Sequence, residues 1–165
     1  MTSTIDIVMG GLGISDNTTS ELKTFVGSCI AICLYDPETK IASMAHVMLP
    51  KNNSSKIPTN SDEIGKFADC AVETMLQKLV SKGCNIKKIK AKMAGGATIF
   101  TTESNDTLFN VGPKNIKAIK ILLAEKNIPL VSEDTGLGFG RWVRFNVKTN
   151  EMSITSSVKK NEKII

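Results

Sequence analysis

Two apolar runs in the first third of the chain have the length and composition of strands. Residues 30–35 and 41–49 are rich in large and β-branched side chains, and turn-forming residues separate them. Pro37 has a φ angle already suited to the second position of a turn. The pattern predicts a β-hairpin with Pro37 and Glu38 at its tip, in which Cys29 directly faces His46.

Longer segments repeat apolar side chains every three or four residues, which predicts amphipathic helices over residues 62–82 and 114–126. Gly83 and Asn127 stand where a helix ends in a left-handed residue. Further strands are expected at residues 5–9, 86–93, 128–133, 142–147 and 151–156. Strands outnumber helices and each helix has one apolar stripe, which indicates sheet covered by helices mainly on one side.

The size of the chain fits one domain. Its 165 residues are 41% hydrophobic, enough for one substantial core. We expect this domain to span residues 1–157, followed by a charged, loosely held tail over residues 158–165. No apolar stretch is long enough for a membrane-spanning helix, and the first residues lack the pattern of a secretory signal.

The cysteines and the net charge further limit the class of protein and the compartment in which it is expected. The four cysteines lack the spacing of a disulfide framework, so we expect them to be reduced and the protein to be cytoplasmic. The net charge of +5 is moderate. The sequence has no helix-turn-helix pattern, zinc signature or basic stripe interleaved with aromatic residues, so nucleic-acid binding is not expected.

Cys29 and His46 are the candidate chemical groups. His46 is the one histidine in the chain. A thiol whose proton passes to an imidazole can attack an acyl carbon, and Gly27 and Ser28 would let backbone N–H groups approach the resulting oxyanion. Two alternatives stay open: a hairpin tip one residue longer would separate the pair onto opposite faces, and free cysteine is most often a small buried hydrophobe.

Metal binding is a weaker alternative. Cys29, Cys33 and His46 offer three ligands, whereas a structural zinc site usually has four. Two strand residues four positions apart are separated by about 13 Å, too far to share one ion. We therefore expect no metal or other cofactor, and we expect Cys33 to lie in the core.

Several segments in order along the chain resemble the CheD family of chemoreceptor glutamine deamidases. They are GSCIAICLYDP at 27–37, MAHVMLP at 44–50, AKMAGGATIF at 91–100, NVGPKN at 110–115, EDTG at 133–136 and GR at 140–141. The similarity extends from about residue 23 to residue 150. On these motifs the chain is identified as a member of that family.

The resemblance implies a fold and a reaction. The fold is an α/β three-layer sandwich with two β-layers, similar to that of the cytotoxic necrotizing factor deamidases. The reaction is hydrolysis of a glutamine side-chain amide in chemoreceptors, by a hydrolase of the protein-glutamine glutaminase type, with Cys29 as nucleophile and His46 as general base. The family's third catalytic residue is a threonine six positions before the cysteine, where this chain has Lys23. Thr24, one residue closer, is the preferred candidate.

The resemblance also implies partners. The substrate would be the cytoplasmic helices of chemoreceptors, and the phosphatase CheC would dock on the loop that contains Gly95, Gly96 and Phe100. A monomer is expected. For Asp134 and Arg141 we expect a buried salt bridge that fixes the glycine-rich loop. The alternative to an enzyme is a non-catalytic chemotaxis adaptor that binds receptors or CheC.

Overall fold

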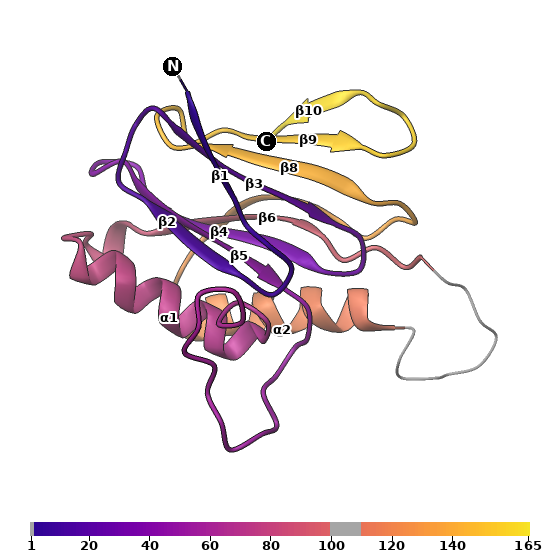
Figure 1. Cartoon of the computed structure of the whole chain (residues 1–165), viewed down its shortest axis with the longest axis horizontal. Helices are drawn as coiled ribbons and strands as arrows, with labels where there is room; N and C mark the ends of the chain where they lie inside the picture. Colours follow the sequence, from indigo (N-terminus) through magenta and orange to yellow (C-terminus); the bar gives the residue numbers. More distant parts are fainter. Residues whose placement is uncertain (1, 100–109) are drawn as a thin grey trace.

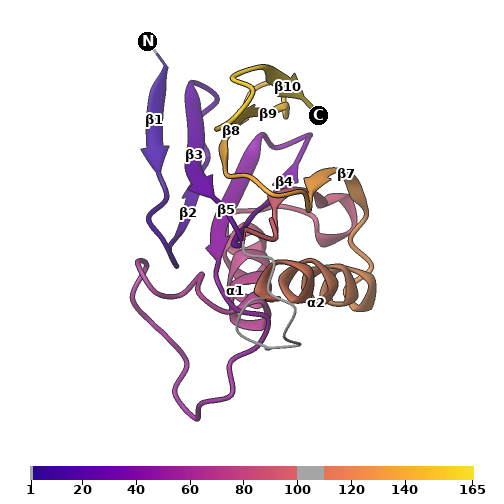
Figure 2. The same ribbon diagram turned by 90° about the vertical axis from the view of Figure 1, so that its right-hand side faces the viewer.

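A computed structural model describes residues 2–99 and 110–165 of the protein. Two five-stranded sheets and two helices form three layers: the helices, a middle sheet and an outer sheet (Figures 1 and 2). Both helices cover the same face of the middle sheet, which leaves its other face for the outer sheet. The expected three-layer α/β/β sandwich is therefore confirmed.

The middle sheet is buried on both faces. In spatial order its strands are β2 (Leu12–Ser15), β5 (Ile41–Val47), β4 (Ile30–Asp36), β6 (Lys90–Gly95) and β7 (Leu130–Thr135). Every residue of β4 and β5 is buried. This position between two layers explains why these two strands are continuous apolar runs instead of alternating ones.

The outer sheet has one face toward solvent. In spatial order its strands are β1 (Ser3–Asp6), β3 (Ser20–Val26), β8 (Arg141–Asn146), β9 (Met152–Ser156) and β10 (Glu162–Ile164). Burial alternates along β3 and β8, as expected for strands that cover a core with one face only.

Two separate cores follow from the three layers. One lies between the helices and the middle sheet and includes Ile30, Ile32 and Val47. The other lies between the two sheets and includes Ala31 and Cys33. Alternate residues of β4 point to opposite cores. Even-numbered residues such as Ile30 and Ile32 therefore face the helices, and odd-numbered residues such as Ala31 and Cys33 face the outer sheet.

Helix α1 spans Ala68–Ser81, so the predicted start at residue 62 is wrong. Residues 62–66 instead pair by their backbone with distant segments: the amide of Gly65 donates to Gly10 O, and Lys66 O accepts from the amides of Met48 and Leu49. These tertiary bonds replace the first helical turns. The predicted end is confirmed, because Gly83 has a left-handed φ of 97°.

Helix α2 spans Val111–Glu125, three residues longer at its start than predicted. Asn127, just beyond it, has a left-handed φ of 55°, as the sequence indicated. Among the described residues, no helix has the length and apolar character needed to cross a membrane.

The hairpin β4–β5 forms, but its predicted register is wrong by two positions. Asp36 pairs with Ile41 and Ala31 pairs with His46, so the loop contains four residues instead of two. The longer loop is closed by a bond from the Lys40 amide to Asp36 O, with Lys40 at φ 56°. Since the error is an even number, Cys29 and His46 still belong to the same face.

Other boundaries also differ from the predictions. The first strand is Ser3–Asp6, a 3₁₀ helix at Ile86–Lys88 precedes β6, and neither β2 nor β3 was predicted. The expectation of a loose tail is wrong for Glu162–Ile164, which pairs with β9 as strand β10. Strand β10 satisfies the backbone hydrogen-bonding groups along the free edge of β9. The charged composition of the segment does not reveal this pairing.

Candidate active site

The candidate groups come from both sheets and from the loop between them. Thr24 lies on β3 of the outer sheet and His46 on β5 of the middle sheet, and both side chains point into the space between the sheets. Cys29 belongs to a three-residue connection between β3 and β4, residues 27–29, which we call the Cys29 loop. The site thus lies at one end of the inter-sheet core.

A hydrogen bond joins Thr24 to His46. Thr24 Oγ1 lies 2.8 Å from His46 Nδ1 and 2.8 Å from Ile7 O. A carbonyl oxygen only accepts, so the single hydroxyl proton of Thr24 goes to Ile7 and the hydroxyl accepts from the ring. Nδ1 therefore carries the ring proton, and Nε2 is left with a lone pair, the form that a general base needs.

Burial keeps the His46 ring neutral. The side chain is only 3% exposed, and this desolvation lowers its pKa from 6.5 to about 4. Among the described residues, none gives Nε2 a hydrogen-bond partner. A neutral imidazole with a buried, unused lone pair is available to take a proton.

Cys29 lies just beyond the end of the β4–β5 ladder, on the side of the sheet that His46 faces. Ala31 pairs with His46, and Cys29 lies two residues before Ala31 on the same face and packs on the inter-sheet core. Within a ladder, residues in such a diagonal position are about 7–8 Å apart, with their Cβ atoms somewhat closer. Burial raises the pKa of the Cys29 thiol, and a hydrogen bond from Ser28 partly offsets the rise. The resting pair is therefore a neutral thiol beside a neutral imidazole.

The carbonyl groups of the Cys29 loop are all anchored to the scaffold. The amide of Ala97 donates to Gly27 O at 2.9 Å, the amide of Gly96 donates to Cys29 O at 2.8 Å, and Asn115 Nδ2 lies 3.4 Å from Ser28 O. In a trans peptide unit the C=O and the following N–H point in opposite directions. Anchoring these carbonyls thus turns the amides of Ser28 and Cys29 the other way. Among the described residues, none accepts from either amide.

Gly95 and Gly96 are buried supports of this loop. A Cβ on Gly95 would lie 2.2 Å from Cys29 O, and one on Gly96 would lie 2.6 Å from the Ile116 side chain. Both also have positive φ, of 116° and 68°. At Gly95 the missing side chain allows the backbone to approach Cys29 of the same chain closely. Their assignment to partner binding stays a prediction, and Phe100 lies outside the described residues.

Arg141 binds the backbone of Gly95, one of the two glycines that support the Cys29 loop. Its fully buried guanidinium pairs with Asp134 at 2.8 Å and donates to Gly95 O and Gly136 O at 3.1 and 2.6 Å. The expected buried salt bridge is confirmed. Its link to Gly95 was not predicted, because a contact between a side chain and a distant carbonyl leaves no periodic signal in a sequence.

Lys23 lies outside this arrangement. Its neighbour Thr24 points inward, so Lys23 points to the solvent face of β3, where its ammonium lies 4.6 Å from the centre of the Trp142 ring. Of the two candidates for a third residue, the geometry brings Thr24 to His46.

No metal cluster accompanies the pair within residues 2–99 and 110–165, where no three His, Cys, Asp or Glu side chains gather closely enough to hold an ion. Cys33, four residues along β4, is completely buried in the inter-sheet core. The predicted core position of Cys33 is confirmed.

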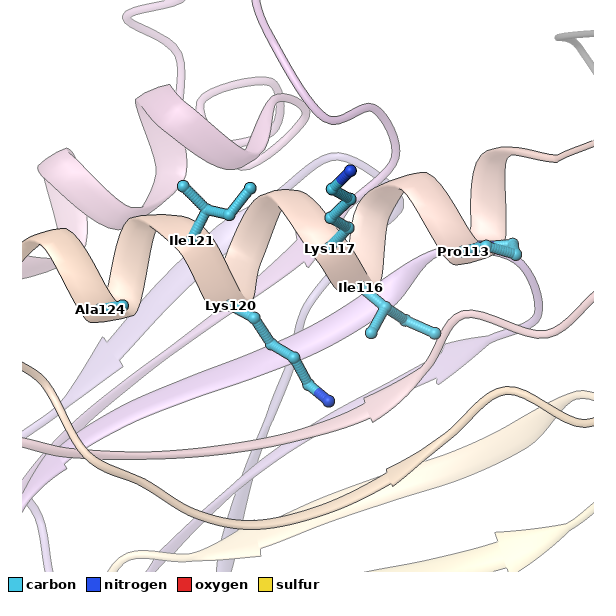
Figure 3. Close-up of a pocket in the computed structure, with 6 residues that line it drawn as sticks. All are labelled: Pro113, Ile116, Lys117, Lys120, Ile121 and Ala124. Carbon is cyan, nitrogen blue, oxygen red and sulfur yellow. The ribbon is translucent and has the colours of Figure 1, made fainter.

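A shallow pocket lies on one face of α2, away from Cys29 and His46. Figure 3 shows Ile116 and Lys120 projecting to one side of the helix and Lys117 and Ile121 to the other. Four of its six lining residues are apolar and two are lysines, so it contains no cysteine or histidine. It adjoins the Cys29 loop through Ile116, which contacts Gly96.

Fold and site together define a class: an α/β/β sandwich with a cysteine and a neutral histidine at one end of the inter-sheet core. A family model described as "CheD chemotactic sensory transduction" matches residues 48–156. The chain belongs to the CheD family.

Named relatives agree with this family. The chain is 43% identical over 148 residues to "Chemoreceptor glutamine deamidase CheD" of Bacillus licheniformis, covering 87% of each chain. It is 39% identical over 168 residues to the protein of the same name in Bacillus subtilis, covering 99% of each. A "Probable chemoreceptor glutamine deamidase CheD" of Lachnoclostridium phytofermentans is 41% identical over 139 residues, 84% of each.

One solved structure shares the fold at low sequence identity. It is the Bacillus licheniformis hypothetical protein YfiH, with a TM-score of 0.50 and 15% identity. The alignment covers 78% of this chain and 51% of that one, so the chain spans about half the length of that protein.

Proposed function

We propose that this protein is a glutamine deamidase that hydrolyses side-chain amides of chemoreceptors to glutamate and ammonia, with Cys29 as nucleophile, His46 as general base and Thr24 as the residue that orients His46. The observation that carries the proposal is the hydrogen-bond chain Ile7 O, Thr24 Oγ1 and His46 Nδ1. It leaves the basic nitrogen of His46 buried and without a hydrogen-bond partner among the described residues. The names of the relatives supply the substrate class.

The first half of the reaction forms a thioester. His46 Nε2 takes the thiol proton as Cys29 Sγ bonds to the carboxamide carbon, and the carbonyl oxygen becomes an oxyanion. When the tetrahedral intermediate collapses, the C–N bond breaks and the proton on Nε2 passes to the leaving nitrogen. Ammonia departs and the acyl group stays on Cys29.

The second half releases the product. Nε2 takes a proton from a water molecule whose oxygen attacks the thioester carbon. The C–S bond then breaks, and the Cys29 thiolate recovers its proton from His46. Every proton is moved by this chain's own residues, so the proposed reaction needs no metal or organic cofactor.

The oxyanion would be held by the Cys29 loop. The amides of Ser28 and Cys29 are directed away from the anchored carbonyls and have no acceptor among the described residues. Removing one such donor from an enzyme typically lowers kcat by about 10²–10³-fold. Gly27 has no side chain, and the Ile99 side chain occupies the space beside it, since a Cβ at this position would lie 2.6 Å from Ile99 Cδ1.

A protein substrate fits the surface around this loop. Three large apolar side chains near it are exposed: Phe25, Ile99 and Leu137, at 41%, 48% and 64%. We call this set the apolar rim. Exposed apolar groups that gather beside a reactive residue are typical of a protein-docking site. The apolar rim supports a receptor helix as substrate, and a substrate on the cytoplasmic side of a receptor implies action in the cytoplasm. The monomeric state stays a prediction.

A non-catalytic role in binding is the second candidate. The same apolar rim would also suit an adaptor that holds receptors or the phosphatase CheC, with Gly95, Gly96 and Phe100 in the docking loop. The intact geometry of Thr24 and His46 favours the enzyme, because an adaptor has no use for a histidine held in one tautomer.

Mass spectrometry of a receptor cytoplasmic fragment tests the proposal. The fragment is incubated with the protein and, as a control, with the Cys29→Ala variant. Each conversion of glutamine to glutamate adds about one mass unit, and we expect it with the unaltered protein alone. If the fragment binds but no glutamine is converted, the enzyme proposal is contradicted for that substrate and the adaptor is favoured.

A further inference from the structure

Asn115 is a buried polar residue in the first turns of α2 that the mechanism above does not use. It is completely buried. Its Nδ2 lies 3.0 Å from Met48 O and 3.4 Å from Ser28 O. Both partners are carbonyl oxygens, which only accept, so the side-chain nitrogen is the atom that faces them.

These two carbonyls belong to the two arms of the site. Ser28 directly precedes Cys29, and Met48 lies two residues beyond His46. One side-chain amide therefore joins the Cys29 loop to the end of the strand that carries the histidine. Of the two contacts, the one to Met48 is shorter.

The contact with Ser28 O also sets the direction of an N–H group. Ser28 C=O and Cys29 N–H are opposite ends of one planar peptide unit. A donor that holds the carbonyl on the α2 side turns the Cys29 amide toward the other side, where the thiol lies. The two flanking carbonyls are held by backbone amides of residues 96 and 97, so this central peptide is the one that depends on a side chain.

Helix α2 presents Asn115 from a fixed position. A Cβ on Gly112 would lie 2.6 Å from Gly96 O and 2.5 Å from Ala97 O, so the start of the helix rests directly on the segment behind the Cys29 loop. One turn beyond Asn115, Ile119 is fully buried in the core under the middle sheet. The helix cannot move without disturbing both contacts.

We propose that Asn115 is a positioning residue that orients the Ser28–Cys29 peptide so that its N–H can receive the oxyanion of the tetrahedral intermediate. The inference rests on the proposed deamidase function. It assigns to Asn115 no contact with the substrate, only the alignment of a donor that makes one.

The test compares two reactions of Cys29 in Asn115→Ala and Asn115→Ser variants. Deamidation of a receptor fragment passes through an oxyanion, whereas alkylation of the thiol by iodoacetamide is a displacement that forms none. We expect Asn115→Ala to lower kcat by about 100-fold, with KM changed by less than about threefold, because a misaligned donor acts on the transition state. The alkylation rate of Cys29 should change by less than about twofold at every pH tested, since alkylation does not depend on that donor.

Asn115→Ser keeps a small polar donor and provides a second variant should Asn115→Ala fold poorly. Ile119→Val is the matched control, because it perturbs the same buried face of α2 without touching either carbonyl; it should retain kcat. An unchanged kcat in both Asn115 variants would overturn the inference while the unaltered protein still deamidates. Equal losses in deamidation and alkylation would also overturn it, by indicating general damage to the site. If the unaltered protein converts no glutamine, the proposed function itself fails.

Discussion

Cys29 and Cys33 lie on the same face of the same part of the chain, four residues apart, and their surroundings differ in kind. Cys29 precedes β4, is partly exposed, and lies in a loop where the amides of Ser28 and Cys29 have no acceptor among the described residues. Cys33 lies within β4, is fully buried, and is paired on both sides by β5 and β6. Both thiols have pKa values raised by burial, that of Cys33 much further.

The comparison shows which features of a position inside a strand oppose the reactivity of a cysteine. Cys33 has Lys92 opposite it, a cation that favours a thiolate, but that ammonium is bonded to Asn150 O and Ile165 O and burial outweighs its effect. The ladder also occupies the backbone of Cys33 on both edges. Cys29 is outside the ladder, where N–H groups are free to bind a developing charge.

Substituting the two cysteines gives the largest expected contrast. Cys29→Ala should lower deamidation by about 10⁴-fold or more, because the nucleophile is lost. Cys33→Ala should keep the rate within about threefold and cost about 1 kcal/mol of stability, a typical value for a buried position. Rates on a receptor fragment and chemical unfolding measure the two effects. A loss of activity in Cys33→Ala comparable to that in Cys29→Ala would break the comparison.

His46→Gln is expected to have the next largest effect, a fall in kcat of about 10²–10⁴-fold, the range for a general base. The alkylation rate of Cys29 should change little, because the resting imidazole is neutral and does not stabilise a thiolate. Iodoacetamide labelling across pH checks this. A large drop in labelling at neutral pH would instead indicate a thiolate–imidazolium pair at rest.

Thr24→Val should lower kcat by about 10–100-fold, the range known for partners that orient metal-bound histidines, because His46 loses the bond that fixes its tautomer. The substitution keeps the shape of the side chain and removes the acceptor for Nδ1–H. Lys23→Ala is the matched control from the same strand and should keep the rate within about twofold, since Lys23 faces solvent beside Trp142. The reverse ranking would assign the third role to Lys23.

The smallest effect concerns stability against acid. The native pKa of His46 is about 4 and its ordinary value is 6.5, so between these values the unfolded chain binds a proton that the folded protein excludes. The contribution is complete above pH 6.5 and is lost as pH falls toward 4. By pH 5 this single group should cost about 2 kcal/mol. Chemical unfolding at pH 8 and 5 should show the loss, and His46→Gln should lack that component.

Much of the layer arrangement could be predicted from the sequence. Periodicity located both helices, and the two continuous apolar runs indicated the hairpin that the middle sheet buries on both faces. The end of α1 was predicted because Gly83 adopts the left-handed conformation that favours glycine after a helix. These features depend on neighbours in the chain.

What failed depends on partners distant in the chain. The register of the hairpin was missed because a four-residue loop with Lys40 in a left-handed conformation competes with a two-residue one. The start of α1 was missed because residues near Gly65 pair with Gly10 instead of continuing the helix. Thr24 was a candidate through resemblance, but its bond to His46 and the contact of Asn115 with Ser28 required the assembled layers.

The long separations within the site have a consequence for folding. Thr24 and His46 are 22 positions apart, Arg141 and Gly95 are 46, and Asn115 and Ser28 are 87. Contacts that close such long loops form slowly, after local helices and hairpins have appeared. During refolding we therefore expect circular dichroism to recover ahead of deamidation. The enzyme's own activity would then report the last step of its assembly.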